Sequence, residues 1–263
     1  MSADLAAALW RTAEDLADVA AEHSLPLFRS AALTVASKAA HFDPVTDADR
    51  DAEQAMRRLL AERRPADGIL GEEFPPVASS SGLTWVLDPI DGTRAFWSGA
   101  PTWGTLIGLD AGSGPVLGLI DQPFIGERFM GGLGRAEVTR GAVRRPALVR
   151  ACAALADAVL YTTFPEVGTA DERQGFEAVR DRVRLTRYGF DCYAYALVAI
   201  GQVDLVIEAG LNPYDIQGPQ AVIEAAGGVV TDWQGGPAHR GGRVIAAGDA
   251  RLHAAALELL ARV

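Results

Sequence analysis

The sequence is poor in cysteine, histidine and lysine, and each shortage excludes a class of protein. Its 263 residues include 2 cysteines, 4 histidines and a single lysine, Lys38, among 24 basic residues. Cys152 and Cys192 cannot form a disulfide framework, so nothing in the chain requires an oxidising compartment. The four histidines are scattered along the chain, which argues against a zinc site.

Excess positive charge and long apolar runs are also missing. The net charge is −10 at pH 7, which argues against nucleic acid and anionic membrane surfaces as partners, because no basic patch is available to displace counterions. No apolar run approaches the roughly 20 residues of a membrane-spanning helix. The first 20 residues carry acids within their apolar stretch, unlike a secretory signal. These features predict a soluble, cytoplasmic, acidic globular protein.

Hydropathy patterns divide the chain into two parts. Apolar residues at three- and four-residue steps predict a helix over residues 3–22, and a second helix is expected over Pro44–Arg63. Strands are then predicted at residues 68–71, 83–87, 103–109, 115–120 and 127–132, which gives an α+β pattern. Beyond about residue 150, strands and helices alternate, as in α/β proteins. We expect an α+β subdomain over residues 1–145 with most of the candidate metal ligands, and an α/β subdomain over residues 146–263 that completes the site.

Acidic residues gather in four short segments at the ends of predicted strands and helices. These segments are Asp43–Asp49, Gly71–Phe74, Asp88–Thr93 and Pro213–Asp215. Taken singly, each has an ordinary explanation as a turn, a solvated strand end or a helix-capping acid. Their joint occurrence is what suggests a site.

The segment Asp88–Thr93, with the sequence DPIDGT, is the most informative of the four. Pro89 is expected to turn the chain out of the sheet after Asp88, and Asp91 to return to the same side. Gly92 permits close approach of a ligand, and Thr93 is expected to cap a short helix whose N-terminal N–H groups face an anion. Acids beside a phosphate-sized site favour Mg²⁺ between them. The spacing does not fit an EF-hand, a P-loop or a serine-hydrolase elbow.

The four segments, the last of which contains Tyr214-Asp215 and is followed by Ala225–Gly228, resemble the inositol monophosphatase superfamily of Mg²⁺-dependent, lithium-sensitive phosphatases. The resemblance covers nearly the whole chain. It implies an α/β fold, a layered αβαβα sandwich of the inositol monophosphatase and fructose-1,6-bisphosphatase type. Within the superfamily, the segments Trp103–Ile107, Val116–Pro123 and Asp191–Tyr195 resemble the histidinol-phosphatase branch. Two positions depart from the family pattern: Tyr214 replaces a tryptophan, and Phe190 stands where a small residue is expected.

The resemblance also implies roles for individual residues. It implies that a first Mg²⁺ is bound by Glu72, Asp88 and the carbonyl of Ile90, a second by Asp88, Asp91 and Asp215, and a third, through water, by Glu73. It implies that the Gly92 and Thr93 N–H groups hold the phosphate, and that Thr93, oriented by Asp49, acts with Glu72 to position and deprotonate the attacking water. Lys38 lies near the metal site in such enzymes, and is otherwise a surface lysine.

Substrate choice is expected to depend on carboxylates outside the metal cluster. Histidinol phosphate carries an ammonium and an imidazole, whereas inositol 1-phosphate offers only hydroxyls beyond its phosphate. Glu208 matches the family's substrate-recognition position, and Asp191 is expected at the same mouth, or else as a helix cap. We therefore expect Mg²⁺-dependent hydrolysis of L-histidinol phosphate in histidine biosynthesis, by a homodimer. The alternatives are an inositol-1-phosphate or broad sugar-phosphate phosphatase and, in another class, a regulatory binding protein of the same fold.

Overall fold

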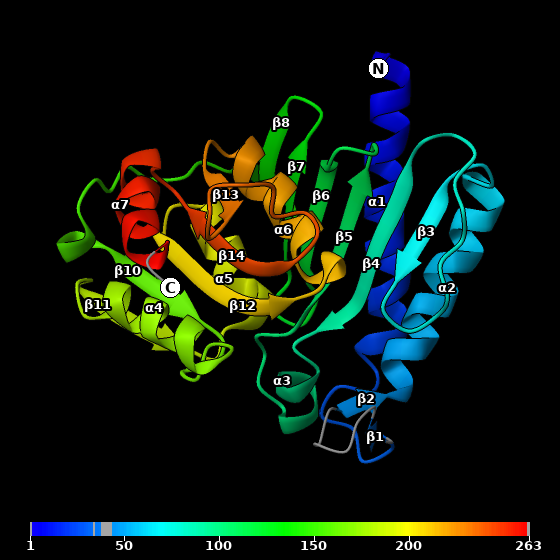
Figure 1. Cartoon of the computed structure of the whole chain (residues 1–263). Coiled ribbons are helices and arrows are strands. Elements are labelled where there is room, and N and C mark those ends of the chain that lie inside the picture. The colour runs from blue at the N-terminus through cyan, green and yellow to red at the C-terminus, as the bar shows by residue number, and fades with distance from the viewer. Residues whose placement is uncertain (1, 34, 38–43, 262–263) are drawn as a thin grey trace.

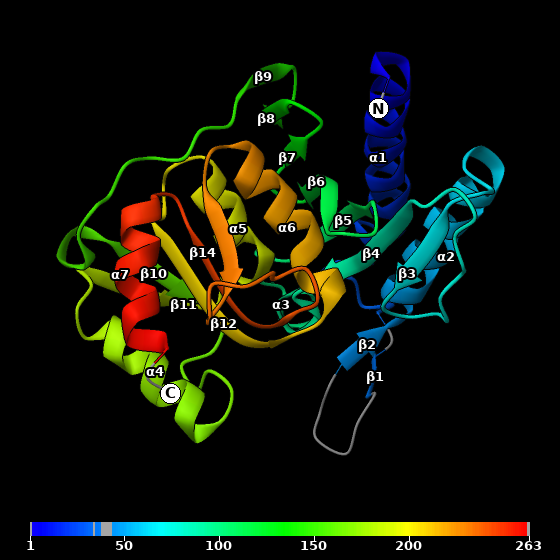
Figure 2. The same ribbon diagram turned by 45° about the horizontal axis from the view of Figure 1, so that its top comes forward.

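The computed structural model describes residues 2–33, 35–37 and 44–261, which fold into five layers (Figure 1). Helices α1 and α2 cover the outer face of the larger sheet, and α5 and α6 lie between the two large sheets. Helices α4 and α7 cover the outer face of the smaller sheet (Figure 2). The layered αβαβα sandwich expected from the sequence is confirmed. The division at residue 145 stays a prediction.

The helices within the described ranges are α1 (Ala3–Ser24), α2 (Asp47–Arg63), α3 (Thr93–Ser98), α4 (Ala170–Arg180), α5 (Asp191–Ala199), α6 (Pro213–Ala225) and α7 (Ala250–Leu260), with a 3₁₀ turn at Leu155–Asp157. The larger sheet has the order β3 (Gly68–Gly71), β4 (Thr84–Asp91), β5 (Gly104–Asp110), β6 (Pro115–Gln122), β7 (Glu127–Gly132), β8 (Arg135–Arg140) and β9 (Val143–Pro146). The smaller has the order β11 (Leu185–Tyr188), β10 (Val159–Thr162), β12 (Leu205–Leu211), β14 (Gly242–Ala247) and β13 (Val229–Asp232). A separate two-stranded ladder joins β1 (Val35–Ser37) and β2 (Pro44–Thr46).

Two sequence predictions need correction. The second helix begins at Asp47 and not at Pro44, because Pro44–Thr46 pairs with β1 and a capping box between Thr46 and Asp49 starts the helix. Strands β8 and β9 extend the predicted meander. Their short, polar sequences gave no periodic signal.

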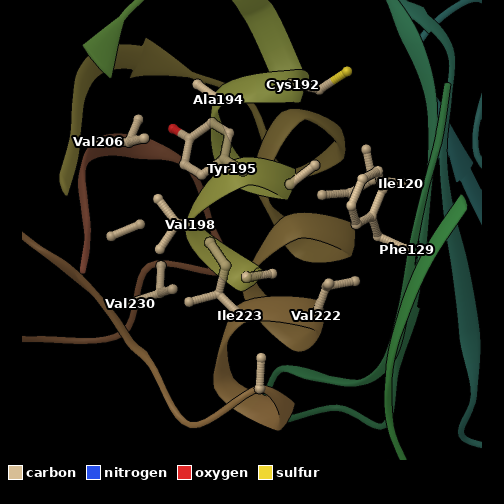
Figure 3. Close-up of a cluster of buried hydrophobic side chains, with 14 of the residues drawn as sticks. Ile120, Phe129, Cys192, Ala194, Tyr195, Val198, Val206, Val222, Ile223 and Val230 are labelled. Carbon is tan, nitrogen blue, oxygen red and sulfur yellow. The ribbon is translucent and has the colours of Figure 1, made fainter. Parts of the chain in front are cut away.

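The hydrophobic core consists of separate clusters between the layers. Leu9, Ala13 and Leu16 of α1 are fully buried against the larger sheet, as their helical spacing predicts. On the other side of that sheet, Ile120 and Phe129 pack with residues of α5 and α6 (Figure 3). This inner cluster fixes α5 and α6 between the sheets.

A row of three glycines lets α6 lie directly on the larger sheet. Gly108, Gly118 and Gly131 are paired across β5, β6 and β7. A Cβ added at Gly118 would lie 2.8 Å from the Ala221 Cβ and closer still to the Gly218 carbonyl oxygen. The absence of side chains along this row therefore sets the depth at which α6 packs.

Candidate active site

The end of β4 places two carboxylates on one side of the sheet. Asp88 pairs with Leu106 and Asp91 with Gly104. Between these two pairs β4 advances three residues and β5 only two. This β-bulge turns Asp91 to the face of Asp88, whereas residues three apart in a regular strand face opposite sides. The chain therefore stays in the sheet at Pro89, contrary to the sequence prediction, because the bulge accommodates a residue without an N–H.

The third carboxylate arrives from α6. Asp215 is the third residue of that helix, and its Oδ2 accepts a hydrogen bond of 2.6 Å from the Asn212 N–H in a capping box. Asp88, Asp91 and Asp215 each offer one oxygen, and these oxygens lie within 4.8 Å of one another. The helix-capping and ligand explanations of Asp215 are thus compatible.

The three carboxylates repel one another in a buried setting. Burial and then Glu72, Asp91 and Asp215 raise the pKa of Asp88 well above its usual range. Burial and the neighbouring acids Asp191 and Asp215 likewise raise the pKa of Asp91. Burial raises the pKa of Asp215 to about 7. Buried carboxylates that repel one another in this way fit a hard divalent cation, which would stabilise the charged forms of all three.

Helix α2 and the turn after β3 bring further groups to the same edge. Glu72 follows Gly71, and its N–H donates to the Leu87 carbonyl at 3.2 Å, beside Asp88. The Glu72 charge acts on both Asp88 and Asp215, although its carboxylate is not in the 4.8 Å cluster. The Glu73 carboxylate lies 3.8 Å from Arg50 Nε.

Asp49 and Thr93 meet as the sequence predicts, but Thr93 does not cap the helix. Gly92 is the N-cap of α3, in the left-handed conformation at φ 80°, and Thr93 is the first helical residue. The Thr93 Oγ lies 3.3 Å from Asp49 Oδ1 and 3.2 Å from the Ile90 carbonyl oxygen. Both are acceptors, so the hydroxyl donates and its oxygen can still accept. Burial raises the pKa of Asp49 to about 6.

A cavity of about 540 Å³ opens in front of Asp91, Gly92, Thr93 and Asp215. Its described lining is strongly acidic, with Arg94 as the one basic residue and five carboxylates, namely Asp91, Glu166, Asp191, Glu208 and Asp215. The lining does not include Asp49, Glu72, Glu73, Asp88 or Ile90. Such a cavity favours cationic occupants.

Asp191 is held in a strained position at the start of α5. Its φ is +46°, unusual for a residue with a side chain, and it follows the N-cap Phe190 rather than capping the helix itself. Its Oδ2 accepts a hydrogen bond of 2.6 Å from the Thr102 hydroxyl, and its side chain lies against Gly92. Burial raises its pKa. The same turn lets the Cys192 N–H donate to Asp91 Oδ2 at 2.6 Å.

Glu208 is buried in the middle of β12 and surrounded by donors. Its Oε1 accepts from the Thr163 N–H at 3.0 Å and the Thr163 hydroxyl at 2.5 Å, and its Oε2 accepts from the Tyr195 hydroxyl at 2.8 Å. Burial raises the pKa of Glu208, and these hydrogen bonds oppose the rise. Thr102, Thr163 and Tyr195 were not among the predicted site residues. Tyr195 stands in the motif Asp191–Tyr195, which is the signal that could have found it.

Other predicted residues have simpler positions. Lys38 lies outside the described residues. Trp103 and Cys192 are buried. Phe190 packs against Tyr161, with ring centroids 4.6 Å apart, and does not line the cavity.

Known proteins resemble this chain along its length. Residues 6–263 match the inositol monophosphatase family. The chain is 44% identical over 228 residues to the bifunctional phosphatase IMPL2, chloroplastic, of Arabidopsis thaliana, and the match covers 82% of this chain and 65% of that protein. It is 34% identical to a histidinol-phosphatase of Chlorobaculum parvum, with 89% and 88% covered. A solved structure of an inositol monophosphatase from Zymomonas mobilis has a TM-score of 0.84 at 44% identity, with 95% and 96% covered.

No helix among the described residues is both long and apolar enough to span a bilayer. The acidic cluster, the layered fold and the match over residues 6–263 agree with one another. The chain therefore belongs to the inositol monophosphatase family, and is a phosphatase of small phosphate monoesters.

Proposed function

We propose that the protein hydrolyses L-histidinol phosphate to L-histidinol and phosphate in a Mg²⁺-dependent reaction. The observation that carries the choice of substrate is the pair Asp191, partly buried, and Glu208, buried, two carboxylates in the cavity wall outside the cluster of Asp88, Asp91 and Asp215. The substrate's ammonium and imidazole give these charges a partner. Inositol 1-phosphate has no cation to offer them.

Both carboxylates retain acceptor capacity for the substrate. A carboxylate has about four lone-pair sites. Hydrogen bonds from Thr163 and Tyr195 occupy three sites of Glu208, and one from Thr102 occupies a single site of Asp191. Because the partners are all donors, they hold both groups ready to accept from a cation.

Mg²⁺, two or three ions per site, is the cation we propose for Asp88, Asp91 and Asp215, with Glu72, Glu73 and the Ile90 carbonyl as further ligands. When bound, it supplies electrostatic stabilisation of the attacking and leaving oxygens of an in-line displacement. The residues of the chain orient the reactants. The N–H groups of Gly92 and Thr93 bind the phosphate at the start of α3.

Thr93 and Glu72 then act on the attacking water. Because the Thr93 hydroxyl donates to Asp49 or to the Ile90 carbonyl, its oxygen accepts a hydrogen bond from the water and fixes its direction. The Glu72 carboxylate takes the proton that the water gives up. This chemistry needs no covalent intermediate.

The test compares phosphate release from L-histidinol phosphate and from inositol 1-phosphate on one preparation. We expect a strong preference for histidinol phosphate. In the variants Asp191→Asn and Glu208→Gln, kcat/KM for histidinol phosphate should fall by about 10–150-fold, because a charge-assisted hydrogen bond contributes about 1.5–3 kcal/mol. An amide still binds hydroxyls, so activity on inositol 1-phosphate should change little.

Glu166→Gln is the matched control, since Glu166 is an exposed carboxylate of the same cavity. Solvent screening should keep its effect on kcat/KM small. A preference for inositol 1-phosphate would leave the metal site intact and refute the choice of substrate. Phosphate release that survives a chelator would refute the metal dependence. No activity on either substrate would favour another phosphate ester as the substrate, or the regulatory binding protein.

We also propose that the protein is a homodimer, which the family resemblance implies, and that it is cytoplasmic, which its composition favours. Light scattering during size-exclusion chromatography tests the oligomeric state. A single species at the monomer mass would refute the dimer.

A further inference from the structure

Helix α2 carries a polar stripe that points into the structure beside the candidate metal cluster. Asp49, Glu53 and Arg57 follow one another at four-residue steps, and so lie on one face of the helix. Asp49 contacts Thr93, as described above. Glu53 is fully buried, and its two carboxylate oxygens accept hydrogen bonds of 2.7 Å from Arg57 Nε and from the Glu73 N–H.

The Glu53–Arg57 pair forms hydrogen bonds with the backbone of the turn that contains Glu72 and Glu73. The remaining guanidinium nitrogens of Arg57 donate to the Phe74 carbonyl at 2.9 Å and to the Pro75 carbonyl at 3.0 Å. The turn is therefore fixed at three consecutive residues by two side chains of one helix.

The preceding residue is shaped to receive Glu53. A Cβ at Gly71 would lie 2.8 Å from Glu53 Oε2 and closer to Oε1. Because that carboxylate is pinned by Arg57 and by the Glu73 N–H, it cannot easily swing away. Gly71 thus lets the Glu53 carboxylate lie directly against the end of β3.

We propose that Glu53 and Arg57 are positioning residues that hold the Glu72 and Glu73 carboxylates at the distance a divalent cation requires. This inference rests on the metal centre of the proposed function. A buried ion pair is a poor source of stability by itself, because desolvation offsets the attraction between the charges. Groups that orient metal ligands, in contrast, typically change metal affinity by about 10–100-fold when removed.

The experiment measures Mg²⁺ binding by calorimetry and the Mg²⁺ dependence of phosphate release in Glu53→Gln. The amide places an N–H against one of two donors, so one contact is lost while size is retained. We expect the Mg²⁺ dissociation constant to rise by about tenfold or more, and saturating Mg²⁺ to restore part of the turnover.

Asp67→Asn is the matched control. Asp67 is also buried, accepts from Arg64 Nε at 2.7 Å and from Trp85 Nε1 at 3.0 Å, and lies just before the opposite end of β3. It should lower the melting temperature yet leave Mg²⁺ affinity within about twofold of wild type, because it orients no candidate ligand. An equal loss of Mg²⁺ affinity in Asp67→Asn would show a general effect of destabilisation and refute the inference.

Wild-type Mg²⁺ affinity in folded Glu53→Gln would refute the positioning role alone. Absence of Mg²⁺ binding in the wild-type protein would refute the metal centre, and with it this inference. If Glu53→Gln does not fold, Arg57→Lys carries the test, since it keeps the charge but loses the paired contacts to Phe74 and Pro75. Unchanged Mg²⁺ affinity in Arg57→Lys would then refute the inference.

Discussion

Replacing Gly118 with alanine is expected to lift α6 off the larger sheet. The new Cβ would lie 2.8 Å from the Ala221 Cβ, whereas ordinary contact begins at 3.4 Å, and the Gly218 carbonyl oxygen is closer still. The helix must therefore withdraw by at least about 0.6 Å. Overpacking of this kind costs about 3 kcal/mol, which lowers the melting temperature of a chain of this size by about 6–12 °C.

The same movement should weaken Mg²⁺ binding. The oxygens of Asp88, Asp91 and Asp215 lie within 4.8 Å of one another. Two oxygens on one Mg²⁺ are at most about 4.2 Å apart, because each bond is about 2.1 Å. Functional groups must hold their positions to within about 0.5 Å, so withdrawal of α6 carries Asp215 out of reach.

Thermal unfolding and Mg²⁺ calorimetry measure the two effects separately, and the glycine row provides a graded series. A Cβ at Gly108 would come no nearer than 2.9 Å to α6, and one at Gly131 would come to 2.5 Å from the Val222 Cα. The loss of stability should follow the order of crowding, with Gly118→Ala the largest. Gly131→Ala should affect Mg²⁺ less than Gly118→Ala, because Val222 lies about two turns from Asp215. Wild-type melting temperature and Mg²⁺ affinity in Gly118→Ala would refute the reasoning.

Asp91→Asn should nearly abolish Mg²⁺-dependent phosphate release, and wild-type turnover would contradict the metal site. In chelator the variant should not have a lower melting temperature, because the amide oxygen keeps the hydrogen bond from the Cys192 N–H and one repelling charge is gone. Tyr195→Phe should cost about 1–3 kcal/mol in urea unfolding, because buried Glu208 loses the hydroxyl donor to Oε2; an unchanged midpoint would contradict this. Burial lowers the pKa of His253 below 6.5, so the unfolded chain binds a proton first as the pH falls through that value, and folding is progressively destabilised. The melting temperature should therefore fall more between pH 7.5 and 5.5 in wild type than in His253→Gln, and equal falls would exclude this contribution.

The residues of the candidate site could be predicted from the sequence because they lie in short contiguous motifs. Asp88 and Asp91 belong to one hexapeptide, and Asp215 follows a helix-start signal, so each could be identified without knowing the fold. The helix over residues 3–22 and most strands were recognisable because apolar residues recur at the period of each element. The order of the layers was predicted from the family resemblance, because hydropathy periodicity indicates single helices and strands and not how they stack.

What could not be predicted depends on contacts between distant segments. Thr102 and Thr163 gain their importance from the carboxylates they meet, which lie 89 and 45 residues further along the chain. The glycines of β5–β7 signal a close approach, but only the packed structure shows that α6 makes it. Glu53 has the spacing of an ordinary helix-surface acid, and its burial follows from where the turn after β3 lies.

The bulge between Asp88 and Asp91 places a strict length requirement on this part of the chain. Because β4 advances three residues where β5 advances two, one residue inserted beside Thr105 of β5 would restore a regular ladder and turn Asp91 to the opposite face of the sheet. A change of side chain at Thr105 alters local contacts, whereas this change in length removes a carboxylate from the site. We therefore expect such insertions to be eliminated during divergence even where substitutions are accepted, so that the number of residues in this part of β5 is retained longer than their identity.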